Sequence, residues 1–183
     1  MRNFKLVLSI LGCLIFFISV ADAQQKNLKL VFIRHAEKQE EGDNLNCQGL
    51  NRSMSLPAVL YRKFGRPSNV YVPALGMGQS TKHTRMLQTI SPFVSKYNLN
   101  INSAFDVKDA RHVGKALLDE SGTIIIVWEH KNLPDILNYI GVRNNLDWPG
   151  NDFDSIWMVT FPNGKAVLTK DREGLNPAAG CPF

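Results

Sequence analysis

The chain has 183 residues, of which 44% are hydrophobic and 20% are charged. This composition supports a packed core of ordinary domain size and excludes whole-chain disorder, and the absence of an internal repeat excludes a solenoid. The net charge of +5 comes from basic residues scattered along the chain. Such a modest excess favours anionic substrates and does not indicate nucleic-acid binding.

Residues 1–23 have the pattern of a cleavable secretory signal. Two basic residues precede an apolar run at residues 6–20, and Ala21-Asp22-Ala23 fits a small-x-small cleavage site. The run is shorter than the roughly 20 residues of a bilayer-spanning helix, so we expect cleavage after Ala23 rather than an uncleaved anchor. A lipoprotein signal ending at Cys13 is disfavoured because the apolar run continues past this cysteine. We therefore expect a periplasmic or secreted protein with no stable membrane insertion after cleavage.

Apolar periodicity divides the rest of the chain into alternating strands and helices. The run TIIIVW at residues 123–128 is continuous, as expected of a strand that is covered on both faces of its sheet. Pro57 lies within a helical pattern and is expected to break or kink it. Trp128 and Trp157 lie in apolar runs and are expected in the core. In chain order, we predict strands at residues 28–33, 70–72, 101–105, 123–128, 155–161 and 165–170, and helices at residues 49–64, 84–97, 107–118 and 133–140.

This alternation predicts an α/β fold with a mostly parallel central sheet flanked by helices on both faces. Pro162-Asn163-Gly164 is a hairpin turn signal between the last two strands, which adds an antiparallel edge strand to the sheet. Residues 76–82 contain two glycines and are expected to form a loop. No composition shift marks a boundary within residues 24–183, so we predict a single domain there.

Cys47 and Cys181 remain after removal of the signal. An even number of cysteines in a chain bound for an oxidising compartment is compatible with a disulfide that ties the C-terminal tail to the region after the first strand. Two free thiols fit the sequence equally well, so both states remain open. The spacing from Cys47 to Arg52 does not match the phosphate loop of cysteine phosphatases, which has one more residue between its cysteine and arginine.

Two histidines and two arginines fall where an open α/β sheet binds ligands, beyond the carboxyl ends of its strands. Arg34 and His35 follow the first predicted strand, and His130 follows the TIIIVW strand. Arg85 opens the helix predicted at residues 84–97, and a helix start offers free backbone N–H groups to an anion. We therefore expect the four side chains to converge on one anion-sized pocket.

The other two histidines, His83 and His112, lie outside these motifs and are predicted to be surface residues. The four histidines show no close spacing of the kind that binds zinc. The sequence therefore gives no indication of a metal site.

The motifs VFIRHAEK, TRMLQT and IIIVWEH, in this order, resemble the histidine phosphatase superfamily, which has the phosphoglycerate mutase-like fold. The resemblance spans residues 28–130, and the segment NDFDSIW further on is also similar to small members of the superfamily. It implies that His35 is the nucleophile and forms a phosphohistidine. It also implies that His130 stabilises the transferred phosphoryl group, that Arg34 and Arg85 clamp its oxygens, and that no cofactor is needed. Guanidinium groups suit this clamp because they match phosphate oxygens with bidentate hydrogen bonds.

Three features depart from the family pattern. Ala36 replaces the usual glycine, the stretch at residues 74–83 is longer than in compact members, and the proton donor is not evident. We favour Glu129 as donor because it adjoins His130, although adjacent residues on a strand point to opposite faces. A turn at the strand end would resolve the same conflict for the Arg34–His35 pair. The candidate donors are Glu129, Glu37, Asp106 and Asp109.

The resemblance and the predicted signal together imply an exported phosphomonoesterase that acts through a phosphohistidine on His35. Export disfavours glycolytic intermediates and protein phosphohistidine, so the expected substrate is a small phosphorylated molecule such as a sugar phosphate or an envelope glycan phosphate. Ala36 and the uncertain donor motivate an alternative, a non-catalytic phosphoanion-binding domain of the same fold. An exported adhesion or structural domain is a third, more remote hypothesis and predicts no phosphate affinity.

Overall fold

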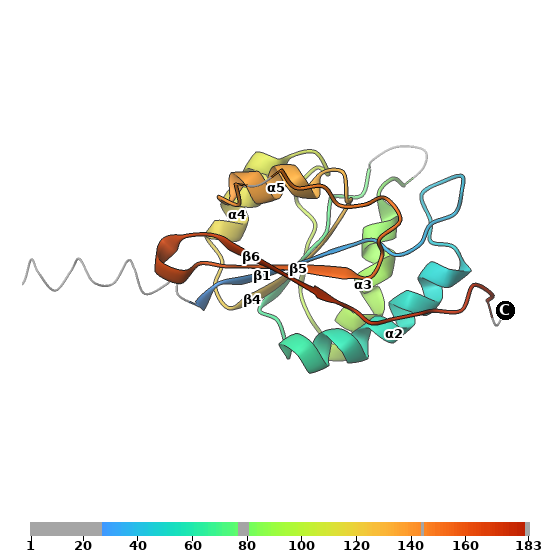
Figure 1. Cartoon of the computed structure of the whole chain (residues 1–183). Helices are drawn as coiled ribbons and strands as arrows, with labels where there is room; N and C mark the ends of the chain where they lie inside the picture. Colours follow the sequence, from blue (N-terminus) through green and yellow to red (C-terminus); the bar gives the residue numbers. More distant parts are fainter. Residues whose placement is uncertain (1–26, 77–80, 144, 182–183) are drawn as a thin grey trace, which may run out of the picture.

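The computed structural model describes residues 27–76, 81–143 and 145–181 (Figure 1). The predicted signal at residues 1–23 lies outside these ranges, as do residues 77–80 of the predicted loop. No helix in the described ranges is long and apolar enough to cross a membrane. The elements are β1 (Lys29–Arg34), α2 (Cys47–Phe64), β2 (Asn69–Tyr71), α3 (Thr84–Tyr97), β3 (Ile101–Asn102), α4 (Ala110–Leu118), β4 (Thr123–Trp128), α5 (Leu133–Tyr139), β5 (Ser155–Thr160), a short 3₁₀ turn η2 (Pro162–Gly164) and β6 (Val167–Arg172).

The strands form one sheet in the order β3-β2-β4-β1-β5-β6. The first four strands of this order are parallel to one another, whereas β5 is antiparallel to both β1 and β6. Figure 1 shows α2 and α3 on one face of the sheet and α4 and α5 on the other. The predicted architecture is confirmed, with an antiparallel edge of two strands.

The core lies on both sides of the central strands. Every residue of the TIIIVW strand after Thr123 is buried, as the continuous apolar run predicts. Trp128 and Trp157 are both buried in the core, which confirms their predicted place. Trp148, for which the sequence makes no prediction, stacks on Trp157 with ring centroids 4.5 Å apart.

Helix α2 begins before its predicted start and continues through its proline. Asn46 caps the helix, because its side-chain oxygen accepts a hydrogen bond from the N–H of Gly49 at 2.9 Å. Of the break or kink expected at Pro57, the break is wrong, since the helix continues to Phe64. Pro57 is itself buried, and packing of the apolar face on both sides of it holds the helix in one piece despite the lost hydrogen bond.

Helix α4 and strand β3 are shorter than predicted by several residues. Helix α4 starts at Ala110 because the carboxylate of Asp109 caps it by accepting from the N–H of His112. Strand β3 has only Ile101 and Asn102, since it lies at the sheet edge and pairs with β2 alone.

Gly49 lies where α2 approaches the loop after β1 most closely. A Cβ at this position would overlap the backbone carbonyl of Glu37, so alanine must push the helix and the loop apart. We expect Gly49→Ala to lower the free energy of unfolding by about 1–3 kcal/mol, measured by urea denaturation. Met54→Ala, at a position of the same helix that is 71% exposed, is the control and should change it by less than about 0.5 kcal/mol. Equal stabilities of the two variants would contradict this close approach.

Candidate active site

Arg34 and His35 reach the same aromatic ring although they are adjacent in the sequence. Strand β1 ends at Arg34, and the N–H of His35 still donates to the carbonyl of Trp128 on β4 at 3.3 Å. The guanidinium carbon of Arg34 lies 3.9 Å from the ring centroid of Phe153. The imidazole of His35 meets the same ring edge-on, with centroids 6.1 Å apart. The end of the strand thus resolves the conflict with strand alternation.

His130 approaches His35 from the neighbouring strand. It follows β4 in the turn before α5, and β4 pairs with β1 in parallel, so both strands end at the same edge of the sheet. The ring centroids of His35 and His130 are 6.4 Å apart. One small ligand can therefore contact both imidazoles.

The two guanidinium groups are each held on one side. Nη1 of Arg34 donates to the carbonyl oxygens of Pro149, Gly150 and Asp152, at 3.2, 2.8 and 3.3 Å. Nη1 of Arg85 donates to the carboxylate of Asp43 at 3.0 Å. These bonds fix the orientation of each guanidinium and leave its remaining N–H groups for another acceptor.

Three buried side-chain nitrogens in the described part of the chain have no hydrogen-bond partner: Nε of Arg34, Nε of Arg85 and Nδ1 of His130. All three belong to residues that the sequence places around one anion. A buried polar group without a partner costs about 1–3 kcal/mol, so such groups are normally satisfied. A tetrahedral oxyanion offers several acceptor oxygens at once and matches this set of donors.

The environment of His35 keeps its imidazole neutral. Burial, aided by the positive charges of Arg34 and Arg85, lowers the pKa of His35 to about 3. Nδ1 lies 2.7 Å from the carbonyl oxygen of Ala36, which only accepts, so the proton is assigned to Nδ1. The lone pair is then on Nε2, the form that a nucleophilic histidine requires. Burial also lowers the pKa of Arg34, to about 10, which leaves this guanidinium charged near pH 7.

The low pKa of His35 has a measurable effect on stability. Between pH 6.5 and about 3 the unfolded chain binds a proton at this imidazole that the folded chain does not, so the stability contributed by neutral His35 is present above pH 6.5 and lost as the pH falls. Relative to His35→Ala, which lacks this group, we expect the native protein to lose on the order of 2 kcal/mol of stability between pH 8 and pH 5. Urea denaturation of both proteins at pH 8 and pH 5 measures it. An NMR titration that protonates His35 above pH 5 would refute this.

The chain is similar to known proteins in its fold. No family model and no curated protein matches the sequence. Among solved structures, a protein assigned as the phosphohistidine phosphatase SixA from Agrobacterium tumefaciens is 15% identical, with a TM-score of 0.57 over 82% of this chain and 98% of that one. A phosphoserine phosphatase mutant from Entamoeba histolytica, in complex with phosphoserine, is 12% identical, with a TM-score of 0.55 over 80% and 97%. Phosphoglycerate mutase from Bacillus anthracis is 11% identical, with a TM-score of 0.53 over 81% and 95%.

The chain has the fold of the histidine phosphatase superfamily. At 11–15% identity, the three structures named above share the fold with this chain.

Ala36, which replaces the glycine usual in this superfamily, causes no backbone strain. It is not among the residues with positive φ. Its N–H donates to the hydroxyl of Thr89 at 2.9 Å, and that hydroxyl donates to the carbonyl of Arg85 at 2.8 Å. Thr89, which closes the TRMLQT motif, thus joins the loop of His35 to the helix of Arg85. The sequence alone assigned no role to Thr89.

Hydrogen bonding separates the four candidate proton donors. The carboxylate of Glu37 is held by Arg52, Asp109 caps α4 and pairs with His112, and Asp106 is exposed and accepts from Lys108. Glu129 is half-buried, and its carboxylate accepts one hydrogen bond, from the side-chain amide of Asn132 at 2.9 Å.

Glu129 also lies within electrostatic reach of the site. Its charge opposes the lowering of the pKa of Arg34 and of His130, which burial dominates in both. Among the four carboxylates, the geometry therefore favours Glu129.

Sequence reasoning missed Phe153 and Asp43. Phe153 contacts both Arg34 and His35, and its place in the NDFDSIW segment was the available signal. Asp43 holds Arg85 but lies in a polar loop with no pattern that marks it.

A pocket of about 600 Å³ lies beside the two histidines rather than over them. Neither histidine lines it, but Phe153 does, so the pocket adjoins the candidate site. Its walls also carry the salt-bridged Arg52. The lining residues are Glu37, Gln48, Arg52, Pro149, Asn151, Asp152, Phe153, Asp154 and Arg172.

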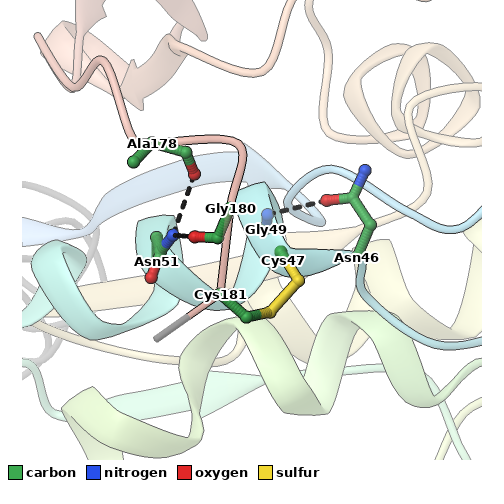
Figure 2. Close-up of a disulfide and its surroundings, with 7 residues drawn as sticks. All are labelled: Asn46, Cys47, Gly49, Asn51, Ala178, Gly180 and Cys181. Carbon is green, nitrogen blue, oxygen red and sulfur yellow. Dashed lines mark hydrogen bonds between the residues drawn. A yellow bond between two sulfur atoms is a disulfide. The ribbon is translucent and has the colours of Figure 1, made fainter. Parts of the chain in front are cut away.

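Cys47 and Cys181 form a disulfide, with their Cα atoms 4.9 Å apart (Figure 2). This decides between the two states that the sequence left open. Cys47 is therefore not a nucleophile, and Arg52 pairs with carboxylates rather than facing a phosphate loop.

No group of three possible ligands in the described residues could hold a metal ion. His112 is exposed, as predicted, and His83 is half-buried at the N-cap of α3. Neither of these histidines joins the candidate site.

Proposed function

We propose that this protein is a phosphatase that hydrolyses phosphate monoesters through a phosphohistidine on His35. One arrangement carries the proposal: a neutral imidazole with a fixed tautomer lies 6.4 Å from a second imidazole. Arg34 and Arg85 lie close enough for their charges to lower the pKa of His35. A nucleophile surrounded by donors to an oxyanion is the arrangement that phosphoryl transfer needs.

In the first step, the lone pair on Nε2 of His35 attacks the phosphorus atom. The bond from phosphorus to the ester oxygen breaks, and the leaving oxygen takes a proton from the carboxyl group of Glu129. In the second step, water attacks the phosphohistidine and gives a proton back to the Glu129 carboxylate. The phosphorus–nitrogen bond breaks, which releases inorganic phosphate and restores neutral His35.

Charge stabilisation falls to Arg34, Arg85 and His130. The transferred phosphoryl group spreads negative charge over three equatorial oxygens in the transition state. Hydrogen bonds to backbone carbonyls and to Asp43 hold the guanidinium groups of Arg34 and Arg85 before substrate binds, so little reorganisation is needed as the charge develops.

The substrate is proposed to be a small phosphate ester met outside the cytoplasm. The signal pattern at residues 1–23 and the Cys47–Cys181 disulfide support export, because disulfides persist in oxidising compartments. Sugar phosphates and envelope glycan phosphates are the corresponding substrates. The solved structures that share the fold include enzymes with different substrates, so the fold does not select the leaving group.

The second candidate is a phosphoanion-binding domain without catalysis. Ala36 no longer motivates it, because the backbone there is not strained. The uncertain proton donor still motivates it, because the carboxylate of Glu129, the favoured donor, already accepts a hydrogen bond from Asn132.

Hydrolysis of a chromogenic aryl phosphate from pH 4 to 8 distinguishes the two candidates, because a good leaving group needs little help from an acid. Brief exposure to a radiolabelled aryl phosphate, followed by an alkaline denaturing quench, should trap a base-stable, acid-labile adduct on His35. Phosphate binding without turnover would support the binding domain. Absence of both would reject both candidates.

A further inference from the structure

The C-terminal segment at residues 173–181 crosses α2 after β6 ends, and we name it the C-terminal strap (Figure 1). Figure 2 shows its far end. The side-chain amide of Asn51 donates to the carbonyl oxygens of Ala178 and Gly180, both at 2.8 Å. The disulfide then joins Cys181 to Cys47 in the first turn of the helix. The far end is therefore covalently attached to α2.

The near end of the strap joins α2 to the segment that carries Phe153. Glu173 is only 4% exposed, and its carboxylate accepts from Nη1 of Arg52 at 2.7 Å. Its N–H donates to the carbonyl of Asp154 at 2.7 Å. The N–H of Leu175 donates to the carboxylate of the same residue at 3.0 Å. Asp154 follows Phe153, the ring on which Arg34 and His35 pack.

Arg52 connects the strap to the loop of His35. Its Nε lies 3.1 and 3.0 Å from the two carboxylate oxygens of Glu37, and its Nη2 donates to one of them at 2.8 Å. Glu37 is two residues beyond His35, and its carbonyl accepts from the N–H of Asn46 at 3.1 Å. Displacement of Arg52 would therefore act directly on this loop.

Arg52 is shared by three carboxylates, those of Glu37, Glu173 and Asp154. Burial opposes the charge of Arg52, but its hydrogen bonds to Glu37 and the charge of Glu173 outweigh burial and raise its pKa. Burial, with repulsion from Asp154 and Glu37, raises the pKa of Glu173 to about 7 although Arg52 opposes this shift. The pKa values of Arg52 and Glu173 are both raised, because every nearby carboxylate stabilises the charged guanidinium, whereas the carboxylates repel one another. Arg172, 3.8 Å from Asp154, is the other cation here.

We propose that Glu173 is a positioning residue: through Arg52 it holds Glu37 and the loop of His35, and the Cys47–Cys181 disulfide keeps the strap in place. The catalytic part of this inference rests on the phosphatase function proposed above. Glu173 itself touches neither His35 nor the groups that would bind phosphate.

The test compares Glu173→Ala with Glu173→Gln, whose amide oxygen can still accept from Arg52. We expect kcat for an aryl phosphate to fall about tenfold in Glu173→Ala, with KM changed less than about twofold, because misplacing the nucleophile costs rate rather than binding. Glu173→Gln should restore most of kcat. Asp171→Asn is the matched control, because it removes an ion pair at the surface between α2 and β6, the strand that ends just before Glu173. It should leave kcat unchanged.

Removing the Cys47–Cys181 disulfide is a second test of the proposal, and it does not require that Glu173→Ala folds. Dithiothreitol, which reduces the disulfide, should lower kcat of the native protein. The double variant Cys47→Ser/Cys181→Ser should have this lower kcat both in the presence and in the absence of dithiothreitol. Unchanged kcat in Glu173→Ala and in the reduced protein would overturn the positioning role while leaving the phosphatase function intact.

A native protein without turnover would instead reject the phosphatase function. In that case NMR of the His35 ring still tests the positioning. We expect a changed His35 resonance in Glu173→Ala and on reduction, and unchanged resonances would overturn the proposal.

Discussion

Replacing His35 with alanine is expected to lower turnover of an aryl phosphate by at least about 10³-fold. The substitution removes the nitrogen that attacks phosphorus, so the covalent intermediate at position 35 cannot form. Affinity for inorganic phosphate should change much less, because Arg34, Arg85 and His130 supply most of its donors. Steady-state kinetics and calorimetric titration with phosphate measure the two effects.

His112→Ala is the matched control for this prediction. His112 is exposed on α4 and pairs with Asp109 away from the site, so its loss should leave turnover within about twofold. If His35→Ala retained the turnover of His112→Ala, a phosphohistidine at position 35 would be excluded. If both lost phosphate binding, a folding defect would be responsible, and far-UV circular dichroism would show it.

Replacing Arg52 with methionine is expected to lower the free energy of unfolding by about 3–5 kcal/mol near pH 8. Arg52 is the shared cation of Glu37 and Glu173, and both carboxylates are buried. Methionine fills much of the volume but leaves these charges without a partner. Arg62→Met, at an exposed position of the same helix, is the control and should cost less than about 0.5 kcal/mol.

The cost of Arg52→Met should fall at pH 5. The pKa of Glu173 is raised from 4.5 to about 7 in the folded protein, so its contribution to stability is present below pH 4.5 and lost as the pH rises through 7. Near pH 5 its carboxyl is mostly protonated and needs the cation less. Urea denaturation at both pH values tests this, and adding Glu37→Gln and Glu173→Gln should recover part of the lost stability. A cost independent of pH would mean that lost packing, not charge, dominates.

The elements of this fold follow from local sequence, whereas their ends depend on the three-dimensional geometry of their caps. The strands and helices were predictable because apolar periodicity is local, and their parallel arrangement brought Arg34, His35 and His130 to one edge of the sheet. Element ends were less predictable, since they depend on caps such as Asn46 and Asp109 whose geometry appears only in three dimensions. Pro57 shows the limit of local rules, because packing on both sides of the proline outweighs a lost hydrogen bond.

The sequence by itself determined the fold class, because apolar periodicity is local, and it predicted four candidate site residues from their places at the ends of strands or the start of a helix. Only the tertiary structure decided which carboxylates are free to act as proton donor. Glu37 is bound by Arg52, 15 residues away, and Arg52 also binds Glu173, 121 residues further on. The same holds for the disulfide, which spans 134 residues. Such pairings depend on how the chain packs, and no local pattern encodes them.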